Sequence, residues 1–235
     1  MTLSFALLNA SHEKEPAKQN IQRELGGDIT EFDIRAGDLP ETVAFDAAII
    51  TGSPASVRDD SSWIDALEAW VAKAIDSELP ILGICFGQQV LADVLGGEVA
   101  DMGTFEIGYH MIKHTPDSRL FDGIDEWFTA FTAHSDEVVE LPSGAEPIAT
   151  NNFSVHGFRK DHVFAVQFHP AFDMETAETV LEYKDVDEKQ INHVLDEITQ
   201  KNYVTARETT QLFDNFSKYV RENRSTPSHD IITEG

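Results

Sequence analysis

Strand-like segments alternate with amphipathic segments over the first 95 residues of the chain. The strand-like segments lie at residues 3–8, 28–34, 45–51 and 81–84. Apolar side chains recur at helical spacing between and after them, in residues 13–25, 61–75 and 88–95. This alternation predicts an α/β fold with a mostly parallel, doubly wound sheet. In such a sheet the active site lies at the carboxyl ends of the strands.

The pattern changes after Gly97. Further strand-like pieces follow at residues 105–113, 126–133, 137–141, 147–151, 154–159 and 163–168. They predict antiparallel additions to the sheet. From Met174 the spacing becomes helical, and the clearest helix is at residues 203–224.

Five apolar or aromatic residues of that last helix suggest a buried face: Val204, Leu212, Phe213, Phe216 and Tyr219. We therefore expect a main domain at residues 1–185 and a helical C-terminal extension at 186–224 that packs on it. A loose polar tail follows at 225–235.

Residues 80–97 hold the only cysteine, Cys85. A buried strand at 81–84 meets a helix there through the pattern Gly-x-Cys-x-Gly, which has the form of a nucleophile elbow with sulfur in place of oxygen. The backbone amide of Phe86, at the start of the helix, would point to where an oxyanion forms. The alternative is a packed thiol, because a lone cysteine beside a buried strand is usually a small hydrophobic residue.

A cysteine nucleophile needs a base, normally histidine, within hydrogen-bond reach. His134 and His169 are the best placed of the nine histidines, and His169 follows a buried strand at the same end of the sheet as Cys85.

The remaining candidates are weaker. His12, His193 and His229 lie in helix or tail contexts that suggest solvation. His110 and His114 are four residues apart, but on a predicted strand this spacing brings no convergence, so no metal site is expected.

The charge balance is strongly acidic, with 42 Asp and Glu against 17 Lys and Arg and a formal net charge of −25. This field repels nucleic acid and anionic membranes, so neither is an expected partner. The acids are scattered along the chain, which favours adaptation of the surface to high salt, where screening removes self-repulsion. An acidic docking surface is the alternative.

The single cysteine fits a reducing compartment. The sequence has no apolar run of about 18 residues or more and no basic, signal-like N-terminus. We therefore expect a cytoplasmic protein.

Several motifs together resemble the class I glutamine amidotransferases, most closely the glutaminase domain of GMP synthase and its stand-alone relatives. They are GICFGQQ at 83–89, VQFHP at 166–170, TGSPASV at 51–57, AHSDEV at 133–138 and EIGY at 106–109. The resemblance covers roughly residues 3–182 in family order and implies the flavodoxin-like fold of that family.

The resemblance implies hydrolysis of a γ-glutamyl amide. Cys85 would attack the amide to give a thioester, and His169 would move the proton. The backbone amides of Gly52 and Phe86 would form the oxyanion hole. No cofactor is expected.

The substrate amino acid would be held by residues of three segments. Gln89 lies four residues past Cys85, on the same side of the helix start. The segments with Glu106 and Gly108, and with His134 and Ser135, would contribute mainly backbone contacts.

One position departs from the family pattern. The family reads His-Pro-Glu, and that glutamate orients the histidine, but this chain has Ala171. Asp173 or Glu175 could substitute, the chain could be a non-catalytic relative, or Ala171 could be an engineered change. We expect an enzyme scaffold with reduced activity.

No nucleotide-activating loop is found in the sequence. An amidotransferase of this kind would therefore pass ammonia to a separate ATP-dependent synthetase. Two alternatives remain open: a γ-glutamyl peptidase that uses Cys85 and His169, and a glutamine-binding regulatory relative.

Overall fold

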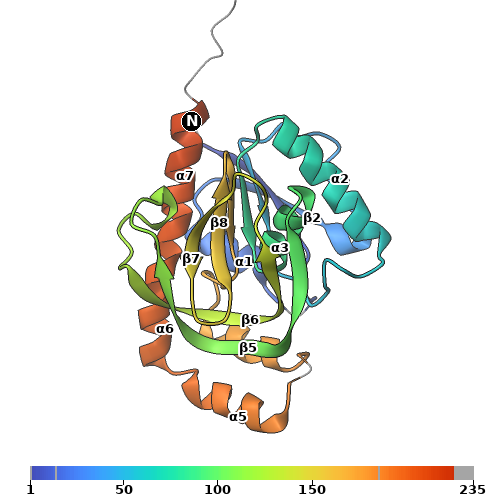
Figure 1. Ribbon diagram of the computed structural model, residues 1–235. Helices are drawn as coiled ribbons and strands as arrows, with labels where there is room; N and C mark the ends of the chain where they lie inside the picture. Colours follow the sequence, from blue (N-terminus) through green and yellow to red (C-terminus); the bar gives the residue numbers. More distant parts are fainter. Residues whose placement is uncertain (1, 14, 185, 225–235) are drawn as a thin grey trace, which may run out of the picture.

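A computed structural model describes residues 2–13, 15–184 and 186–224 (Figure 1). The strands are β1 (Ser4–Asn9), β2 (Asp28–Asp33), β3 (Ala47–Ile50), β4 (Ile81–Ile84), β5 (Glu98–His114), β6 (Trp127–Glu140), β7 (Glu146–Thr150), β8 (Val155–Lys160) and β9 (Val163–Val166). The α-helices are α1 (Ala17–Glu24), α2 (Ser62–Asp76), α3 (Phe86–Val94), α4 (Met174–Leu181), α5 (Glu188–Glu197), α6 (Gln200–Ala206) and α7 (Gln211–Arg224). Short 3₁₀ turns are η1 (Ile34–Ala36), η2 (Arg119–Phe121) and η3 (Arg207–Thr210).

The strands form one nine-stranded sheet in the order β2-β1-β3-β4-β9-β8-β7-β5-β6. Pairing is parallel from β2 to β9 and antiparallel from β9 to β6. The predicted α/β fold, a mostly parallel doubly wound sheet with antiparallel additions and C-terminal helices, is confirmed. The segment at 163–168, expected as an antiparallel addition, instead forms β9, which is parallel to β4 and antiparallel to β8. Because β3, β4 and β9 are parallel neighbours, the residues that follow them meet at one edge.

Helices cover both faces of the parallel sheet. Apolar residues of α1 and α7 pack with Phe5, Leu7 and Phe164 on one face. Those of α2 and α3 pack with Leu8 and Ile50 on the other. Figure 1 shows α2 and α7 on opposite sides of the molecule.

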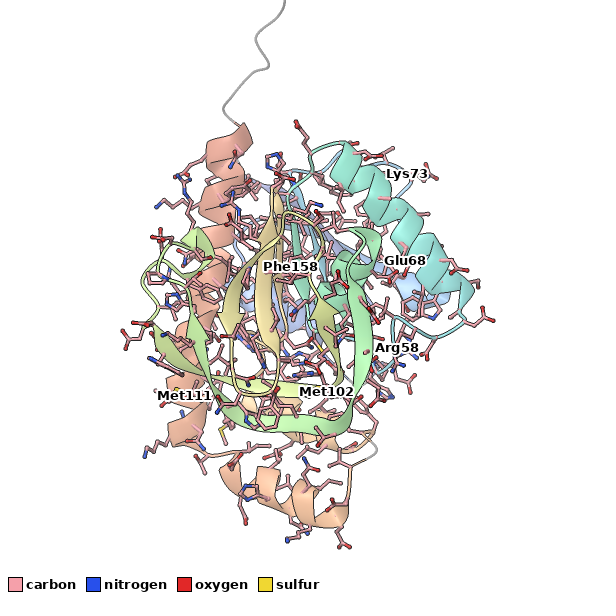
Figure 2. The ribbon with its side chains drawn as sticks, viewed as in Figure 1. Arg58, Glu68, Lys73, Met102, Met111 and Phe158 are labelled. Carbon is pink, nitrogen blue, oxygen red and sulfur yellow. The ribbon has the colours of Figure 1, made fainter. Side chains whose placement is uncertain are left out.

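A third, smaller core lies between α4, α5 and the long strands β5 and β6. Side chains near the antiparallel strands differ widely in exposure: Phe158 of β8 is fully buried, whereas Met111 of β5 is 56% exposed (Figure 2). The helices of residues 186–224 thus contribute to two cores, with α7 in the main one.

Several predicted elements were wrong in extent, among them the piece at 105–113, which is part of the longer strand β5 at 98–114. The pieces at 126–133 and 137–141 are one strand, β6, because His134 and Asp136 between them pair with Glu106 and Asp101 of β5. The first helix begins only at Ala17, after Pro16 at its N-cap.

The predicted helix at 203–224 is interrupted by η3. There the hydroxyls of Thr209 and Thr210 bond to the carbonyls of Ala206 and Arg207, which competes with regular helix bonding. Val204 is 58% exposed and does not belong to a buried face, whereas Leu212, Phe213, Phe216 and Tyr219 are buried as expected. The tail at 225–235, with His229, lies outside the described residues.

Of the carboxylate residues that the structure describes, only Glu106 and Asp136 are buried.

No helix among the described residues is long and apolar enough to span a membrane.

Candidate active site

Cys85 stands at the turn between β4 and α3. Its φ of 53° lies in the left-handed region, which is strained for a residue with a side chain. The turn is held by its amide, which donates to Val166 O at 2.8 Å, and by its carbonyl, which accepts from Gln88 N at 2.9 Å. A Cβ on Gly87 would lie 2.5 Å from the carbonyl oxygen of Ile50, so only glycine fits there. The elbow geometry expected from the sequence is present.

His169 lies against the same turn from the end of β9. Its amide donates to Phe131 O at 2.8 Å, and its ring stacks on Phe172 with centroids 4.1 Å apart. A Cβ built on Gly52 would lie 2.9 Å from His169 Cε1 and 3.5 Å from Cys85 Cβ. Gly52, Cys85 and His169 therefore converge around one point, and any larger residue at position 52 would force the histidine away.

The electrostatics of the pair are set by burial. Burial raises the pKa of the Cys85 thiol to about 11, against opposing effects of the Lys184 charge and the Phe86 amide. Burial, together with the charges of Lys184 and His134, lowers the pKa of His169 to about 3. In this structure the two groups are thus a neutral thiol and a neutral imidazole. No described residue hydrogen-bonds to His169 Nε2.

A cavity of about 230 Å³ opens beside Cys85. Gln89, His134 and Ser135 line it, as do the cations Arg58 and Lys184 and the acids Asp101 and Asp136. The Gln89 amide donates to Asp136 O at 3.2 Å and to Gln167 Oε1 at 3.3 Å. A cavity with charges of both signs beside the Cys85 thiol suits a zwitterionic ligand.

Two expected substrate-binding residues lie elsewhere. Gly108 stands against Val194 and Glu197 of α5, where a Cβ would meet Glu197 Oε2 at 2.9 Å. Glu106 is buried behind the cavity wall, and neither residue is among those that line the cavity.

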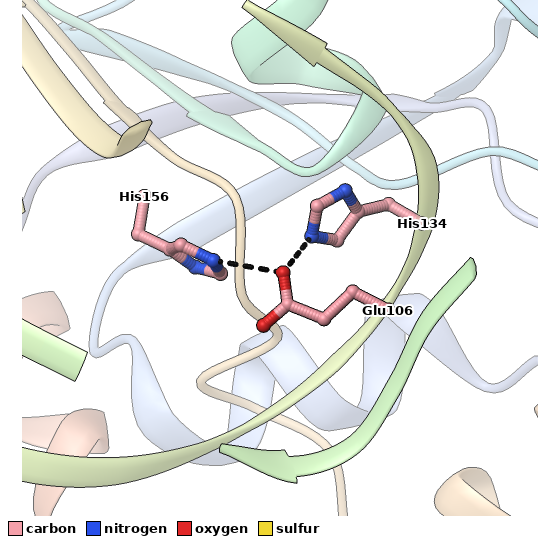
Figure 3. Close-up of side chains that lie close together, drawn as sticks. All are labelled: Glu106, His134 and His156. Carbon is pink, nitrogen blue, oxygen red and sulfur yellow. Dashed lines mark hydrogen bonds and ion pairs between the residues drawn. The ribbon is translucent and has the colours of Figure 1, made fainter. Parts of the chain in front are cut away.

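The Glu106 carboxylate is enclosed by polar partners. Its Oε2 lies 2.9 Å from His134 Nε2 and 3.1 Å from His156 Nε2, while Oε1 accepts from Asn151 Nδ2 at 2.6 Å (Figure 3). Burial alone would raise the pKa of Glu106, but these histidines outweigh it and hold the pKa far below its usual value.

Ala171 leaves a void beside the histidine. A small cavity of about 30 Å³ is lined by His169, Ala171, Glu15, Ser11 and other residues. The Ala171 carbonyl accepts from Arg23 Nη2 at 2.7 Å.

The bonds described for Asp173 and Glu175, the two carboxylates considered as partners of His169, do not include one to that histidine. Asp173 caps α4 by accepting from Thr176, and its other oxygen binds Arg23 at 2.9 Å. Glu175 is exposed in the first turn of α4.

Sequence reasoning missed Lys184, Arg58, Asp136 and His156. Lys184 comes from the segment after α4, and no spacing signal could have placed it at Cys85. Arg58 was findable, because it follows Gly52 in the loop at the carboxyl end of β3. His156 lies on β8, and its meeting with Glu106 of β5 depends on the pairing of three antiparallel strands, β8, β7 and β5.

Comparison with known proteins gives a family. The family model described as "Glutamine amidotransferase class-I" matches residues 16–188. Among curated relatives, the "GMP synthase [glutamine-hydrolyzing]" of Thermomicrobium roseum is 37% identical over 123 residues, which are 52% of this chain and 22% of the relative. That of Campylobacter lari is 36% identical over 154 residues, 60% of this chain and 29% of the relative. The chain therefore spans less than a third of the length of these relatives.

Solved structures share the fold. A glutamine amidotransferase from Thermotoga maritima aligns with a TM-score of 0.77 at 20% identity, covering 94% of this chain and 99% of the other. A glutamine amidotransferase from Methylobacillus flagellatus gives a TM-score of 0.76 at 19% identity, over 92% and 94%.

Proposed function

The chain belongs to the class I glutamine amidotransferase family, and we propose that it hydrolyses the side-chain amide of glutamine, or a related γ-glutamyl amide, through Cys85. The observation that carries the proposal is the convergence of Gly52, Cys85 and His169 from the ends of three neighbouring strands beside a polar cavity.

In the proposed reaction the Cys85 sulfur attacks the amide carbon of the substrate. His169 takes the thiol proton as the C–S bond forms and gives it to the leaving nitrogen, so that ammonia departs and a γ-glutamyl thioester remains. Water then attacks the thioester, again with His169 as base, and the proton returns to the sulfur as glutamate leaves. Because both groups are neutral at rest, the proton moves during attack and not beforehand.

The backbone amides of Phe86 and Gly52 would donate hydrogen bonds to the oxyanion of each tetrahedral intermediate. Phe86 is the first residue of α3, where amides have no partner within the helix and the helix dipole favours negative charge. Loss of one such donor costs roughly 10²–10³-fold in rate in other acyl-transfer enzymes.

The test is incubation of the purified chain with glutamine, with ammonia, glutamate and intact protein mass followed together. We expect release of both products and a glutamyl adduct that is absent in Cys85→Ala. Turnover only of larger γ-glutamyl conjugates would favour a peptidase. Binding of glutamine without adduct or product would favour a regulatory relative and contradict the proposal.

Ala171 is the basis for proposing a reduced rate. Without a carboxylate to accept its N–H, the tautomer and orientation of His169 are unsecured, and loss of the acid in a serine triad costs about 10⁴-fold. We expect Ala171→Glu to raise kcat by about 10–10³-fold, less than that limit because packing on Phe172 already holds the His169 ring in part.

The matched control is Ala171→Gln, which fills the same space without the charge. Glu15 lines the same cavity, so a second carboxylate there would raise the pKa of one of them. The double change Glu15→Gln with Ala171→Glu removes that conflict. If neither Glu variant exceeds Ala171→Gln, the missing acid does not limit the rate.

We further propose that the ammonia serves a separate ATP-dependent synthetase. The support is the similarity to a small part of glutamine-hydrolysing GMP synthases. A synthetase chain that raises the glutaminase rate on mixing would support this, and an unchanged rate with uncoupled ammonia release would count against it.

A further inference from the structure

Glu106, His134 and His156 form a buried cluster that amide hydrolysis does not use. They come from three different strands, β5, β6 and β8, and their side chains are 0%, 2% and 0% exposed. One ligand atom from each lies within 4.8 Å of the other two. Figure 3 shows both imidazole rings directed at the same carboxylate oxygen.

The hydrogen bonds of His134 leave a conflict at its other nitrogen. Nδ1 lies 2.9 Å from the backbone carbonyl of Asp136, which can only accept, so Nδ1 carries the hydrogen. In a neutral ring Nε2 then presents a lone pair, yet it lies 2.9 Å from the Glu106 carboxylate. Two acceptors at this distance need a cation between them, either a proton or a metal ion.

Surrounding hydrogen bonds orient the His134 ring and the Glu106 carboxylate in the way that metal ligands are usually oriented. The Asp136 carbonyl sets the tautomer of His134, and Asn151 holds Oε1 of Glu106, which leaves Oε2 free to face the rings. Partners of this kind orient the ligands of known metal sites. His156 Nδ1, in contrast, is buried without a partner among the described residues.

We propose that Glu106, His134 and His156 bind a divalent transition-metal ion, with Zn²⁺ as the first candidate. Imidazole nitrogens and a carboxylate oxygen suit Zn²⁺, and bonds of about 2.0–2.2 Å place tetrahedral donors roughly 3.3–3.5 Å apart. The observed N–O separations of 2.9 and 3.1 Å lie close to that spacing.

The proposed metal site adjoins the Cys85 cavity, and a bound ion would affect the wall of that cavity. His134 lines the cavity of Cys85, so the cluster lies directly behind the cavity wall. The Asp136 carbonyl that holds His134 also accepts from Gln89, so a metal-bound His134 would fix one wall of the substrate cavity. The ion is a positioning element here and takes no part in the proposed hydrolysis.

The test uses the whole chain, stripped with a chelator and then titrated with ZnCl₂. We expect one equivalent to remain after gel filtration and, at about 100 times the Kd, a Tm increase of about 5–10 °C. His156→Gln should lose the retained equivalent and the Tm increase.

The matched control is His193→Gln. The exposed His193 pairs with the half-buried Glu197 on α5, with Nε2 and Oε1 3.5 Å apart, and this pair could bind zinc adventitiously. The control should keep the bound equivalent. Equal loss in both variants, or none in His156→Gln, would overturn the proposal.

A measurement on the unaltered chain tests the proposal even if the His156→Gln variant misfolds. X-ray absorption of the zinc-loaded protein should show two imidazole ligands with bonds of about 2.0–2.1 Å and oxygen in the remaining positions. Failure to retain zinc, or a spectrum without two imidazoles, would mean that a proton on His134 resolves the conflict.

Discussion

His169 is buried, stacks on Phe172 and has no described hydrogen-bond partner at Nε2. Its position is therefore fixed mainly by backbone and packing contacts. These contacts keep the histidine beside Cys85, although no described residue bonds to its Nε2. The burial of His169 also determines how the site should respond to pH.

We expect the acid limb of kcat/KM for glutamine to lie well below pH 6.5. The neutral imidazole is the base, and the lowered pKa of His169, about 3, keeps it neutral in acid solution where an ordinary histidine of pKa about 6.5 would be protonated. In Ala171→Glu the added carboxylate raises that pKa, so the limb should move to higher pH. Rates between pH 4.5 and 9 measure both.

Stability must be followed over the same range. A neutral buried histidine stabilises the fold fully above its unfolded pKa of about 6.5, and this contribution is lost as the pH falls toward the folded value. Circular dichroism at each pH separates unfolding from protonation. A limb centred near pH 6.5 in a folded, unaltered protein would contradict the lowered pKa.

Lys184 gives a second prediction at the scale of one residue. Its charge opposes the effect of burial on the Cys85 thiol, so Lys184→Gln should raise the thiol pKa further. We expect alkylation by iodoacetamide at pH 8 to slow about 3–10-fold. Lys189→Gln, an exposed lysine on α5, is the control. The pH dependence of alkylation distinguishes a pKa change from altered access, and an unmoved profile would contradict the role of Lys184.

At the scale of elements, α7 connects the C-terminal segment to the main core. Phe216 is fully buried and packs edge-to-face on Phe164 of β9, with ring centroids 6.0 Å apart. The helix therefore supports, from one face, the strand that leads to His169.

Phe216→Ala should lower the free energy of unfolding by about 3–5 kcal/mol, through lost burial and the cavity left behind. Val204→Ala on the exposed face of α6 should change it by less than about 0.5 kcal/mol. Urea denaturation measures both. Similar small effects in the two variants would show that α7 is not part of the cooperative core.

The alternating elements of the first 97 residues were predictable because β1, β3 and β4 are short apolar runs, and the edge strand β2 alternates between apolar and polar residues. Cys85, His169 and Gly52 follow three such strands, so their convergence followed from topology. Lys184, Asp136 and His156 were not predictable in the same way. Their positions depend on the single long strand β6, its pairing with β5, and the segment after α4, and none of these is specified by local spacing.

At the scale of the whole molecule, all but two of the carboxylate residues that the structure describes are at least partly exposed. Asp136 is one of the two buried carboxylates described, and it is paired with Arg58 at 2.7 Å. The remaining acids repel one another through solvent, a repulsion that salt screens within about 3 Å at 1 M.

We expect the Tm to rise by about 5–10 °C between low salt and molar KCl, equivalent to roughly 2–3 kcal/mol for a chain of this size. Unfolding in dilute buffer and recovery in KCl would agree with adaptation to high salt. Indifference to KCl would contradict it and favour an acidic docking surface. Sucrose at equal osmolality is the control for effects other than charge screening.

Because Cys85 is the only sulfhydryl in the chain and is 4% exposed, every thiol-specific reagent reports on one place. When the cavity opens more slowly than the reagent reacts, the labelling rate of Cys85 equals the rate of that opening. Protection by glutamine would give occupancy directly, without any need for turnover. Cys85, the residue proposed to break the amide bond, is thus also an intrinsic probe of how often the structure around it opens.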